Sequence, residues 1–269
     1  MRIPQTAHLT AYYRALEDER LDALFRDPWA KTLVWFPPET WANTPAGLVP
    51  TRMGIFEDLT AQVIALRTRI IDELIFVALD DGVNEVINIG AGLDTRPYRL
   101  PLPKTLLWVE IDHRRVIEYK EEKLAGETPR CQLRRIGMDI VVSEGLAAAG
   151  LPERDRVLIV TEGLLMYLGK ETVAAFADEL AGNESIDYWI VEYIPQKIAP
   201  MVFNWLPYRT QIDDWPHFFE EHSWYPKEIR YLPEEGERLG RPLPATDKHC
   251  AGYALLCKTN PLTTPAPED

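Results

Sequence analysis

Residues 86–96, with the sequence VINIGAGLDTR, constrain the fold more than any other part of the chain. The first half of this stretch is a short apolar run with β-branched residues, and the second half places Gly90 and Gly92 before Asp94 and Thr95. That order is typical of a buried strand, a tight turn and the start of a helix that Asp94 or Thr95 could cap. Glycines also let a ligand approach the backbone without meeting a Cβ atom. Ligands of open α/β sheets bind at the carboxyl ends of such strands, so the sequence predicts a ligand crevice here.

Two other interpretations of this stretch compete with a specific ligand site. Gly-x-Gly alone fits equally well a turn that binds nothing. A nicotinamide dinucleotide fold would require Gly-x-Gly-x-x-Gly/Ala, with a phosphate at the helix N-terminus. Here Thr95 occupies the third glycine position, and the neighbouring carboxylate of Asp94 would repel a pyrophosphate. A cationic ligand fits better, and S-adenosylmethionine carries a sulfonium, an amino acid tail and no phosphate.

Composition limits the possible partners and the compartment. The chain has 269 residues, enough for one large domain with an appended cap, and its formal net charge is −13. This acidity argues against nucleic acid and anionic membranes as partners. No apolar run approaches the roughly 20 residues that span a bilayer, and the first residues lack a signal-peptide core. The three cysteines have neither metal-site nor disulfide-frame spacing, so we expect no metal and a cytoplasmic location. The oligomeric state, monomer or homodimer, stays open.

Residues 1–80 are predicted to form a helical cap and a leading helix. Proline breaks residues 1–50 into short helices, which we expect to lie over the crevice. Residues 51–80 form one long helix, because apolar residues recur in steps of three and four. Arg67 and Arg69 interrupt that pattern, and their simplest interpretation is a solvated face.

Residues 81–260 alternate between short apolar runs and helical patterns. This rhythm predicts an α/β fold with a mostly parallel sheet and helices on both faces. Further strands are expected at residues 105–112, 132–138, 156–161, 187–193 and 251–258. A hairpin near residues 243–258 would add an antiparallel strand. Residues 194–231 are interpreted as an irregular aromatic insertion that forms a substrate wall, and residues 261–269 as a loose tail.

Acidic residues follow several of the predicted strands. Asp112 lies 20 positions after Gly92, where an acid can accept hydrogen bonds from ribose hydroxyls. Glu110 is a rival on the same strand face, but Asp112 is nearer the crevice. Asp139 ends the next strand and could meet an adenine amino group, or could equally be a turn aspartate. Glu162 ends the fourth strand at the same edge of the sheet.

Four motifs in order resemble the leucine carboxyl methyltransferase family: RTRIID at 67–72, GAGLDTRPYR at 90–99, VEID at 109–112 and TEGLLMY at 161–167. The chain looks most similar to the bacterial branch, which includes polyketide O-methyltransferases of the tetracenomycin type, over about residues 10–260. The resemblance implies a class I methyltransferase fold, Rossmann-like, with a seven-stranded sheet whose last strand is antiparallel. It also implies S-adenosylmethionine as methyl donor.

The resemblance also implies which residues of this sequence contact the cofactor, position by position within the matching motifs. The resemblance implies that Arg67 holds the methionine carboxylate, a pairing that suits a guanidinium group. Glu162 would lie near the methionine ammonium or its supporting turn. The other implied positions are Gly90 and Gly92 beside the methionine portion, Asp112 on the ribose, Asp139 and Ile140 at the adenine, and Tyr167 beside Glu162.

The predicted activity is S-adenosylmethionine-dependent O-methylation of a carboxylate or phenolic hydroxyl on a small molecule, such as a polyketide or other natural product. The alternatives are carboxyl methylation of a protein or peptide C-terminus, a non-catalytic cofactor-binding protein, and an oxidoreductase, which Asp94 and Thr95 disfavour. A carboxylate acceptor is ionised at pH 7 and needs positioning more than a base. Arg209 or Tyr193 is the candidate for positioning the acceptor, and His217 or His222 for a general base if the acceptor is a hydroxyl.

Overall fold

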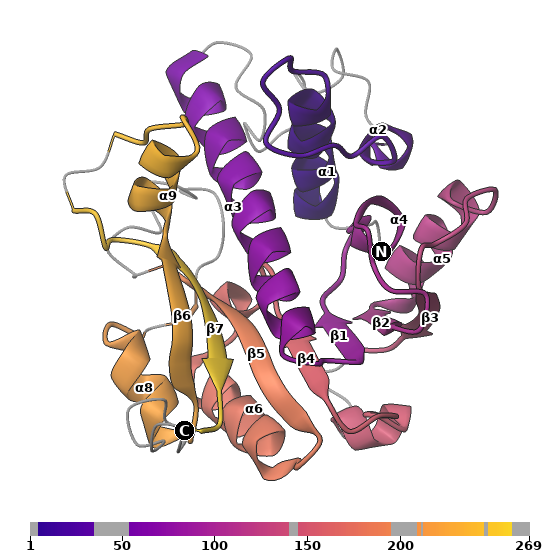
Figure 1. The fold of residues 1–269 in the computed structure, drawn as a ribbon, viewed down its shortest axis with the longest axis vertical. Helices are drawn as coiled ribbons and strands as arrows, with labels where there is room; N and C mark the ends of the chain where they lie inside the picture. Colours follow the sequence, from indigo (N-terminus) through magenta and orange to yellow (C-terminus); the bar gives the residue numbers. More distant parts are fainter. Residues whose placement is uncertain are drawn as a thin grey trace, which may run out of the picture.

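One sheet organises the computed structural model, which describes residues 5–34, 54–139, 145–194, 209–210, 212–244 and 247–259. Within these residues seven strands pair in the order β3-β2-β1-β4-β5-β7-β6 (Figure 1). Their bounds are β1 Glu85–Ile89, β2 Leu107–Asp112, β3 Gln132–Gly137, β4 Val157–Val160, β5 Ile186–Tyr193, β6 Tyr225–Tyr231 and β7 Gly252–Cys257. Strands β1 to β5 run parallel to one another, whereas β7 pairs antiparallel with both β5 and β6. The predicted seven-stranded sheet with an antiparallel last strand is confirmed.

The central strands are apolar on both faces, because helices cover each side of the sheet. Successive side chains of a strand point to opposite faces. In β1, Val86 packs into the core beneath α3 (Gly54–Asp80), while Ile87 packs into the core shared with α6 (Lys170–Gly182). This double burial explains why these strands appear in the sequence as continuous hydrophobic runs.

The C-terminal part of helix α3 lies over one face of the sheet, and its N-terminal part extends beyond the strands between α1 and α9 (Figure 1). Its apolar stripe includes Leu66, Ile70 and Leu74, which are completely buried. The predicted long helix is therefore confirmed, and α9 (Leu232–Arg238) packs beside it. The opposite face is covered by α6 and by α8 (Trp215–Glu221). None of the described helices combines the length and the apolar character needed to cross a bilayer.

The N-terminal region packs above the carboxyl ends of the first strands. Helix α1 (Gln5–Asp18) contacts both α2 (Ala30–Leu33) and α3. The short α4 (Arg96–Arg99) follows β1, and α5 (Arg114–Lys123) follows β2. Two short 3-10 helices are η2 (Leu146–Ala149) and η3 (Leu165–Tyr167). Residues 1–4 and 35–53 of the predicted cap lie outside the described residues, as does the tail at 261–269.

The second half of the predicted aromatic insertion is regular structure. Residues 215–221 form α8 and residues 225–231 form the edge strand β6, so the expected irregular wall is wrong for this part. Trp215, Phe219 and Trp224 are buried against β5 and α6 as core residues. The partner of β7 is β6, so the expected hairpin near residues 243–258 is also wrong. Residues 195–208 lie outside the described part of the chain.

Candidate functional site

A cavity of about 690 Å³ lies at the carboxyl ends of β1, β2 and β4. Its walls come from α1, α3 and the segments that follow β1 to β4. The volume falls within the range of roughly 300–1,000 Å³ that is typical of small-molecule sites. The cavity therefore occupies the place where the sequence predicts the ligand crevice.

The polar residues of the cavity share one face of the sheet. Val86, Trp108 and Val160 belong to the core on the α3 side of the sheet. Asn88 follows Val86 by two positions, Asp112 follows Trp108 by four, and Glu162 follows Val160 by two. Because side chains two residues apart point the same way, all three project toward the α3 side. This alternation brings groups from three strands to one cavity wall.

The glycine turn after β1 is built for close approach. Gly90 and Gly92 have φ angles of +71° and +48°, a region that L side chains rarely adopt. A Cβ atom on Gly90 would also lie 3.3 Å from the Cδ1 atom of Leu164. The amide of Gly92 donates a 2.7 Å hydrogen bond to Oδ2 of Asp112, which ties the turn to the end of β2. The turn thus presents bare backbone to the cavity.

The choice between Glu110 and Asp112 is resolved by burial. Glu110 is completely buried and forms ion pairs of 2.7 Å with Lys120 and 2.8 Å with Arg135. Asp112 lines the cavity, and its Oδ1 atom accepts the amide of His113 at 2.6 Å. Glu110 is therefore a structural charge, and Asp112 is the strand-end acid available to a ligand.

Asp139 marks the β3 end of the cavity. It lines the cavity together with His113, whose Nδ1 atom lies 3.9 Å from Oδ2 of Asp139. Ile140, the other residue expected near an adenine, lies outside the described residues.

Arg67 and Glu162 pair at the opposite end of the cavity. Nε of Arg67 lies 2.7 Å from Oε1 of Glu162, and Nη1 of Arg96 donates to Oε2 of Glu162 at 2.5 Å. Burial opposes the charge of Glu162, but the guanidinium groups of Arg96 and Arg67 outweigh it and hold the pKa of that carboxyl below its usual range. Glu162 is thus ionised and orients Arg67 within the cavity wall.

The interpretation of Arg67 as part of a solvated face is wrong. Only 9% of this residue is exposed, and it lines the cavity. Arg69, by contrast, is paired with Glu73 at the helix surface. A signal for this difference exists in the sequence, because Arg67 follows Val63 by four positions and precedes Ile70 by three. It therefore lies on the apolar stripe of the helix.

Asp94 caps the helix after the glycine turn, and Thr95 does not. Oδ1 of Asp94 accepts the amide of Arg96 at 3.0 Å, and Oδ2 accepts a 2.9 Å hydrogen bond from the side chain of Asn88. Burial acts against its charge, but Arg96 and more distant cations keep the pKa of Asp94 well below its ordinary value. The predicted negative charge at this turn is therefore present, within a buried ion network.

That network continues into the N-terminal helix, which sequence reasoning did not foresee. Arg96 and Arg99 both pair with Asp72, at 2.7 and 2.6 Å. Arg14 of α1 donates to Asp27 at 2.8 Å and to the carbonyl oxygen of Leu93 in the glycine turn at 2.6 Å. The hydroxyl of Thr95 donates to the same Asp27 carboxylate at 2.7 Å. One set of buried charges thus joins the cap, α3 and the glycine turn.

The remaining candidate residues divide into two groups. Tyr167 and Arg209 line the cavity, and the amide of Arg209 donates to the carbonyl oxygen of Met166 at 2.8 Å. Tyr193, His217 and His222 do not line it. Tyr193 packs against Trp215 with ring centroids 4.9 Å apart.

His217 in α8 and His222 just after it have surface partners instead. His217 lies 3.5 Å from Glu221, and His222 lies 2.6 Å from Asp178. The structure therefore does not bring the predicted bases to the site.

Comparisons with known proteins identify the family of the chain. The model of the leucine carboxyl methyltransferase family matches residues 7–181. A protein of Mycobacterium sp. (strain KMS) is 31% identical over 91% of this chain and 90% of its own length, and one of Parafrankia sp. (strain EAN1pec) is 28% identical over 95% and 87%. Both carry the provisional name S-adenosyl-L-methionine-dependent methyltransferase.

A crystal structure from Thermobifida fusca YX, provisionally described as a methyltransferase, superimposes with a TM-score of 0.54 at 12% identity. It covers 92% of this chain and 94% of its own, and at that identity it supports the fold alone. The family match covers well over half of the described elements, from α1 through most of α6. The chain belongs to the leucine carboxyl methyltransferase family and is an S-adenosylmethionine-dependent methyltransferase.

Proposed function

We propose that the cofactor lies across the carboxyl ends of the strands, with adenine near Asp139, ribose on Asp112 and the methionine carboxylate on Arg67. The strand order β3-β2-β1-β4 supports this placement, because it aligns these residues along the cavity. Each oxygen of Asp112 accepts one backbone amide, and each has a second lone pair available for a ribose hydroxyl. The donor supplies an electrophilic methyl group, and these side chains fix its position.

The methyl acceptor is proposed to be the carboxylate of a small, largely apolar molecule. Arg209 lines the cavity at its β4 end, beside the segment that contains Met166. Its side chain is exposed and belongs to none of the ion pairs found among the described residues. Leu9, Ile64 and Leu168 supply apolar surface to the same cavity. A cation beside apolar walls suits an anionic group on an apolar body.

The positions of the histidines favour a carboxylate over a neutral hydroxyl. A phenol or alcohol would need a base within hydrogen-bond reach to remove its proton. Of the described histidines, the one that lines the cavity is His113, which lies beside Asp139 at the opposite end. A carboxylate is already ionised near pH 7 and requires orientation and exclusion of water.

The decisive experiment is methyl transfer from labelled S-adenosylmethionine to matched sets of aromatic carboxylic acids, phenols and C-terminal peptides. A methyl ester releases labelled methanol in mild alkali, whereas a phenol methyl ether does not. Base-labile label on small acids supports the proposal. Base-stable label would show hydroxyl methylation, and base-labile label confined to peptides would favour a protein acceptor.

Replacing Arg209 with alanine is expected to raise the KM for the acceptor at least about tenfold, because a charged hydrogen bond contributes about 1.5–3 kcal/mol. Affinity for S-adenosylhomocysteine should stay unchanged, since Arg209 is assigned to the acceptor. Arg209→Lys, which keeps the charge, should raise the KM for the acceptor by a smaller factor. Steady-state kinetics and calorimetry measure the two effects, and an unchanged acceptor KM in Arg209→Ala would remove this residue from the site.

The double variant His217→Ala/His222→Ala is expected to keep turnover within about twofold of the wild type. Both side chains pair with surface carboxylates rather than with the cavity. The double variant therefore loses these two pairs and the contact of the His222 ring with Phe218, and none of these contacts reaches the cavity. The measurement is kcat at saturating acceptor. A large loss of kcat in a folded double variant would restore the general-base mechanism.

We also place the enzyme in the cytoplasm. Cys131 and Cys257 are free thiols, which fits a reducing compartment.

A further inference from the structure

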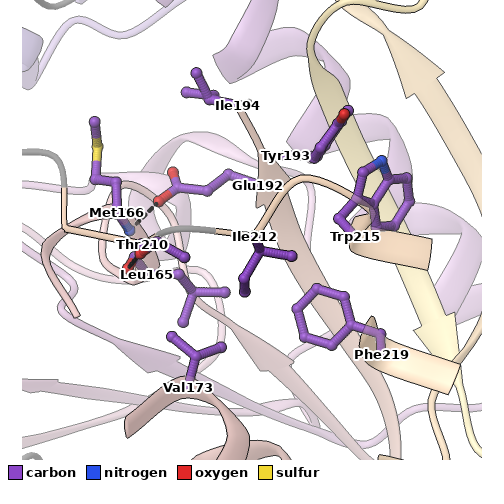
Figure 2. A pocket seen from close by; sticks show the side chains of 10 residues that line it. All are labelled: Leu165, Met166, Val173, Glu192, Tyr193, Ile194, Thr210, Ile212, Trp215 and Phe219. Carbon is purple, nitrogen blue, oxygen red and sulfur yellow. Dashed lines mark hydrogen bonds between the residues drawn. The ribbon is translucent and has the colours of Figure 1, made fainter. Parts of the chain in front are cut away.

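Glu192 lies near the end of β5, in contact with the segment that follows β4. Its Oε2 atom accepts the amide of Gly163 at 2.7 Å, and its Oε1 atom accepts the amide of Met166 at 3.2 Å. Figure 2 shows the carboxylate directed toward Met166 and Thr210, with Tyr193 pointing the other way. Only 9% of Glu192 is exposed, and the small apolar cavity that it borders is lined by Val173, among other residues.

The segment held by Glu192 forms one end of the cofactor cavity. We call residues 162–168 the β4 turn; Glu162, Gly163, Leu164, Met166, Tyr167 and Leu168 all line the cavity. Gly163 has a φ angle of +68°, a conformation that glycine adopts without a steric penalty. The two amides bonded by Glu192 lie three residues apart in this turn.

The β4 turn also carries the acceptor end of the site. The amide of Arg209 donates to the carbonyl oxygen of Met166 at 2.8 Å. The hydroxyl of Thr210 bonds the carbonyl oxygen of Leu165, and it lies 2.8 Å from that of Leu168. A change in the turn would therefore move Arg209 as well as the wall around Glu162.

We propose that Glu192 is a positioning residue whose ionised carboxylate fixes the β4 turn, and with it both the cofactor wall and Arg209. An ionised carboxylate accepts hydrogen bonds at both oxygens, whereas a protonated one turns one oxygen into a donor. Protonation would therefore weaken one of the two bonds that hold the turn. This inference rests on the placement of the cofactor proposed above.

The surroundings of Glu192 place its titration in the physiological range. Burial raises its pKa to about 7, although the charge of Arg67 and the two backbone amides act in the opposite direction. The other titratable groups around it are Glu162 on the β4 turn, Tyr253 opposite it on β7, and Tyr167. Because Glu192 changes charge near pH 7, cofactor affinity should rise as the pH increases through that value.

The test is the affinity for S-adenosylhomocysteine, measured by calorimetry from pH 6 to pH 8.5. We expect the wild type to bind S-adenosylhomocysteine about tenfold more tightly at pH 8.5 than at pH 6. At low pH, protonation of Glu192 replaces a hydrogen bond to a charged carboxylate with a weaker one. Glu192→Gln keeps one acceptor oxygen and no charge, so it should bind about as weakly as the wild type at pH 6, with little change across the range. The variant should fold, since glutamine adds no buried charge.

Glu85 provides a matched control. It is a buried glutamate, like Glu192, and it accepts two backbone amides, from Glu153 at 2.9 Å and Arg154 at 2.8 Å. It is the first residue of β1, so it lies at the end of that strand opposite the cavity. Glu85→Gln should therefore show the affinity and the pH profile of the wild type, even if its stability changes.

Two results would overturn the proposal. One is a Glu192→Gln profile that follows the wild type over the whole pH range. The other, which needs no variant, is equal hydrogen-exchange protection of the β4 turn at pH 6 and pH 8.5 in the wild type, after correction for intrinsic exchange rates. A wild type that binds no S-adenosylhomocysteine at any pH would instead contradict the cofactor placement itself.

Discussion

Asp112→Ala is expected to weaken the binding of S-adenosylhomocysteine at least about tenfold. The substitution removes the proposed ribose acceptor, and it also releases the amide of Gly92, which Oδ2 of Asp112 holds at 2.7 Å. Loss of one charged hydrogen bond alone accounts for about a tenfold change. Calorimetric titration of the purified variant measures the effect.

Asp187→Ala is the control for this experiment. Asp187 lies near the start of β5 and forms an exposed ion pair with Arg156 at 3.3 Å. Its loss should leave affinity unchanged. If the folded Asp112→Ala variant bound as tightly as this control, the ribose would have to lie elsewhere and the cofactor orientation would be wrong.

Arg96→Met should lower the free energy of unfolding by about 3–5 kcal/mol at pH 7.5, the usual cost of removing one partner from a buried ion pair. Only 2% of the Arg96 side chain is exposed, and its guanidinium group lies within 3.2 Å of Asp72, Asp94 and Glu162. Urea unfolding followed by tryptophan fluorescence measures the loss. Arg156→Met, which breaks only the exposed pair with Asp187, should cost less than about 1 kcal/mol.

The loss in the free energy of unfolding caused by Arg96→Met should become smaller as the pH falls toward 5. In the wild type the pKa values of Asp94 and Glu162 are lowered, so these carboxylates stabilise the fold above their ordinary pKa near about 4, and that stability is lost below it. Without Arg96 fewer cations offset the burial of Asp94 and Glu162, so we expect both pKa values to rise, and protonation as the pH falls toward 5 to relieve part of the uncompensated charge. A deficit that stays constant from pH 7.5 to pH 5 would show that lost packing, not charge, explains the effect.

The features predicted well from the sequence are those that a repeating apolar pattern determines. The long helix α3 and the strands β1, β2 and β4 bury their side chains against two layers, so burial dominates their composition. Asp112 could be located because the distance from a glycine turn to the end of the next strand is set by the helix between them.

The edge strand β6 could not be predicted in the same way. Its sequence, YPKEIRY, contains proline and three charged residues, and most of its side chains are partly exposed. Edge strands tolerate such residues because one side of the backbone needs no partner. The strand forms because it pairs with β7. This pairing depends on residues distant in the chain, so the sequence of β6 alone does not reveal it.

The ion network escaped prediction for a related reason. A charged residue in a helix is ordinarily solvated, and only the three-dimensional arrangement shows that Arg14, Arg67 and Arg96 are buried and paired with carboxylates. Arg96 was visible within the motif, but its pairing with Asp72 joins residues 24 positions apart.

The bonds of Asp27 have a consequence for how the protein melts. This carboxylate is completely buried and shared between Arg14 of the N-terminal helix and Thr95 at the ligand turn. Detaching the first helix would take the guanidinium group of Arg14 away from this buried carboxylate and leave it only the more distant cation of Arg99, at 4.0 Å. We therefore expect the first helix and the glycine turn to unfold together, so that the helix beside the cavity also helps to keep that turn folded.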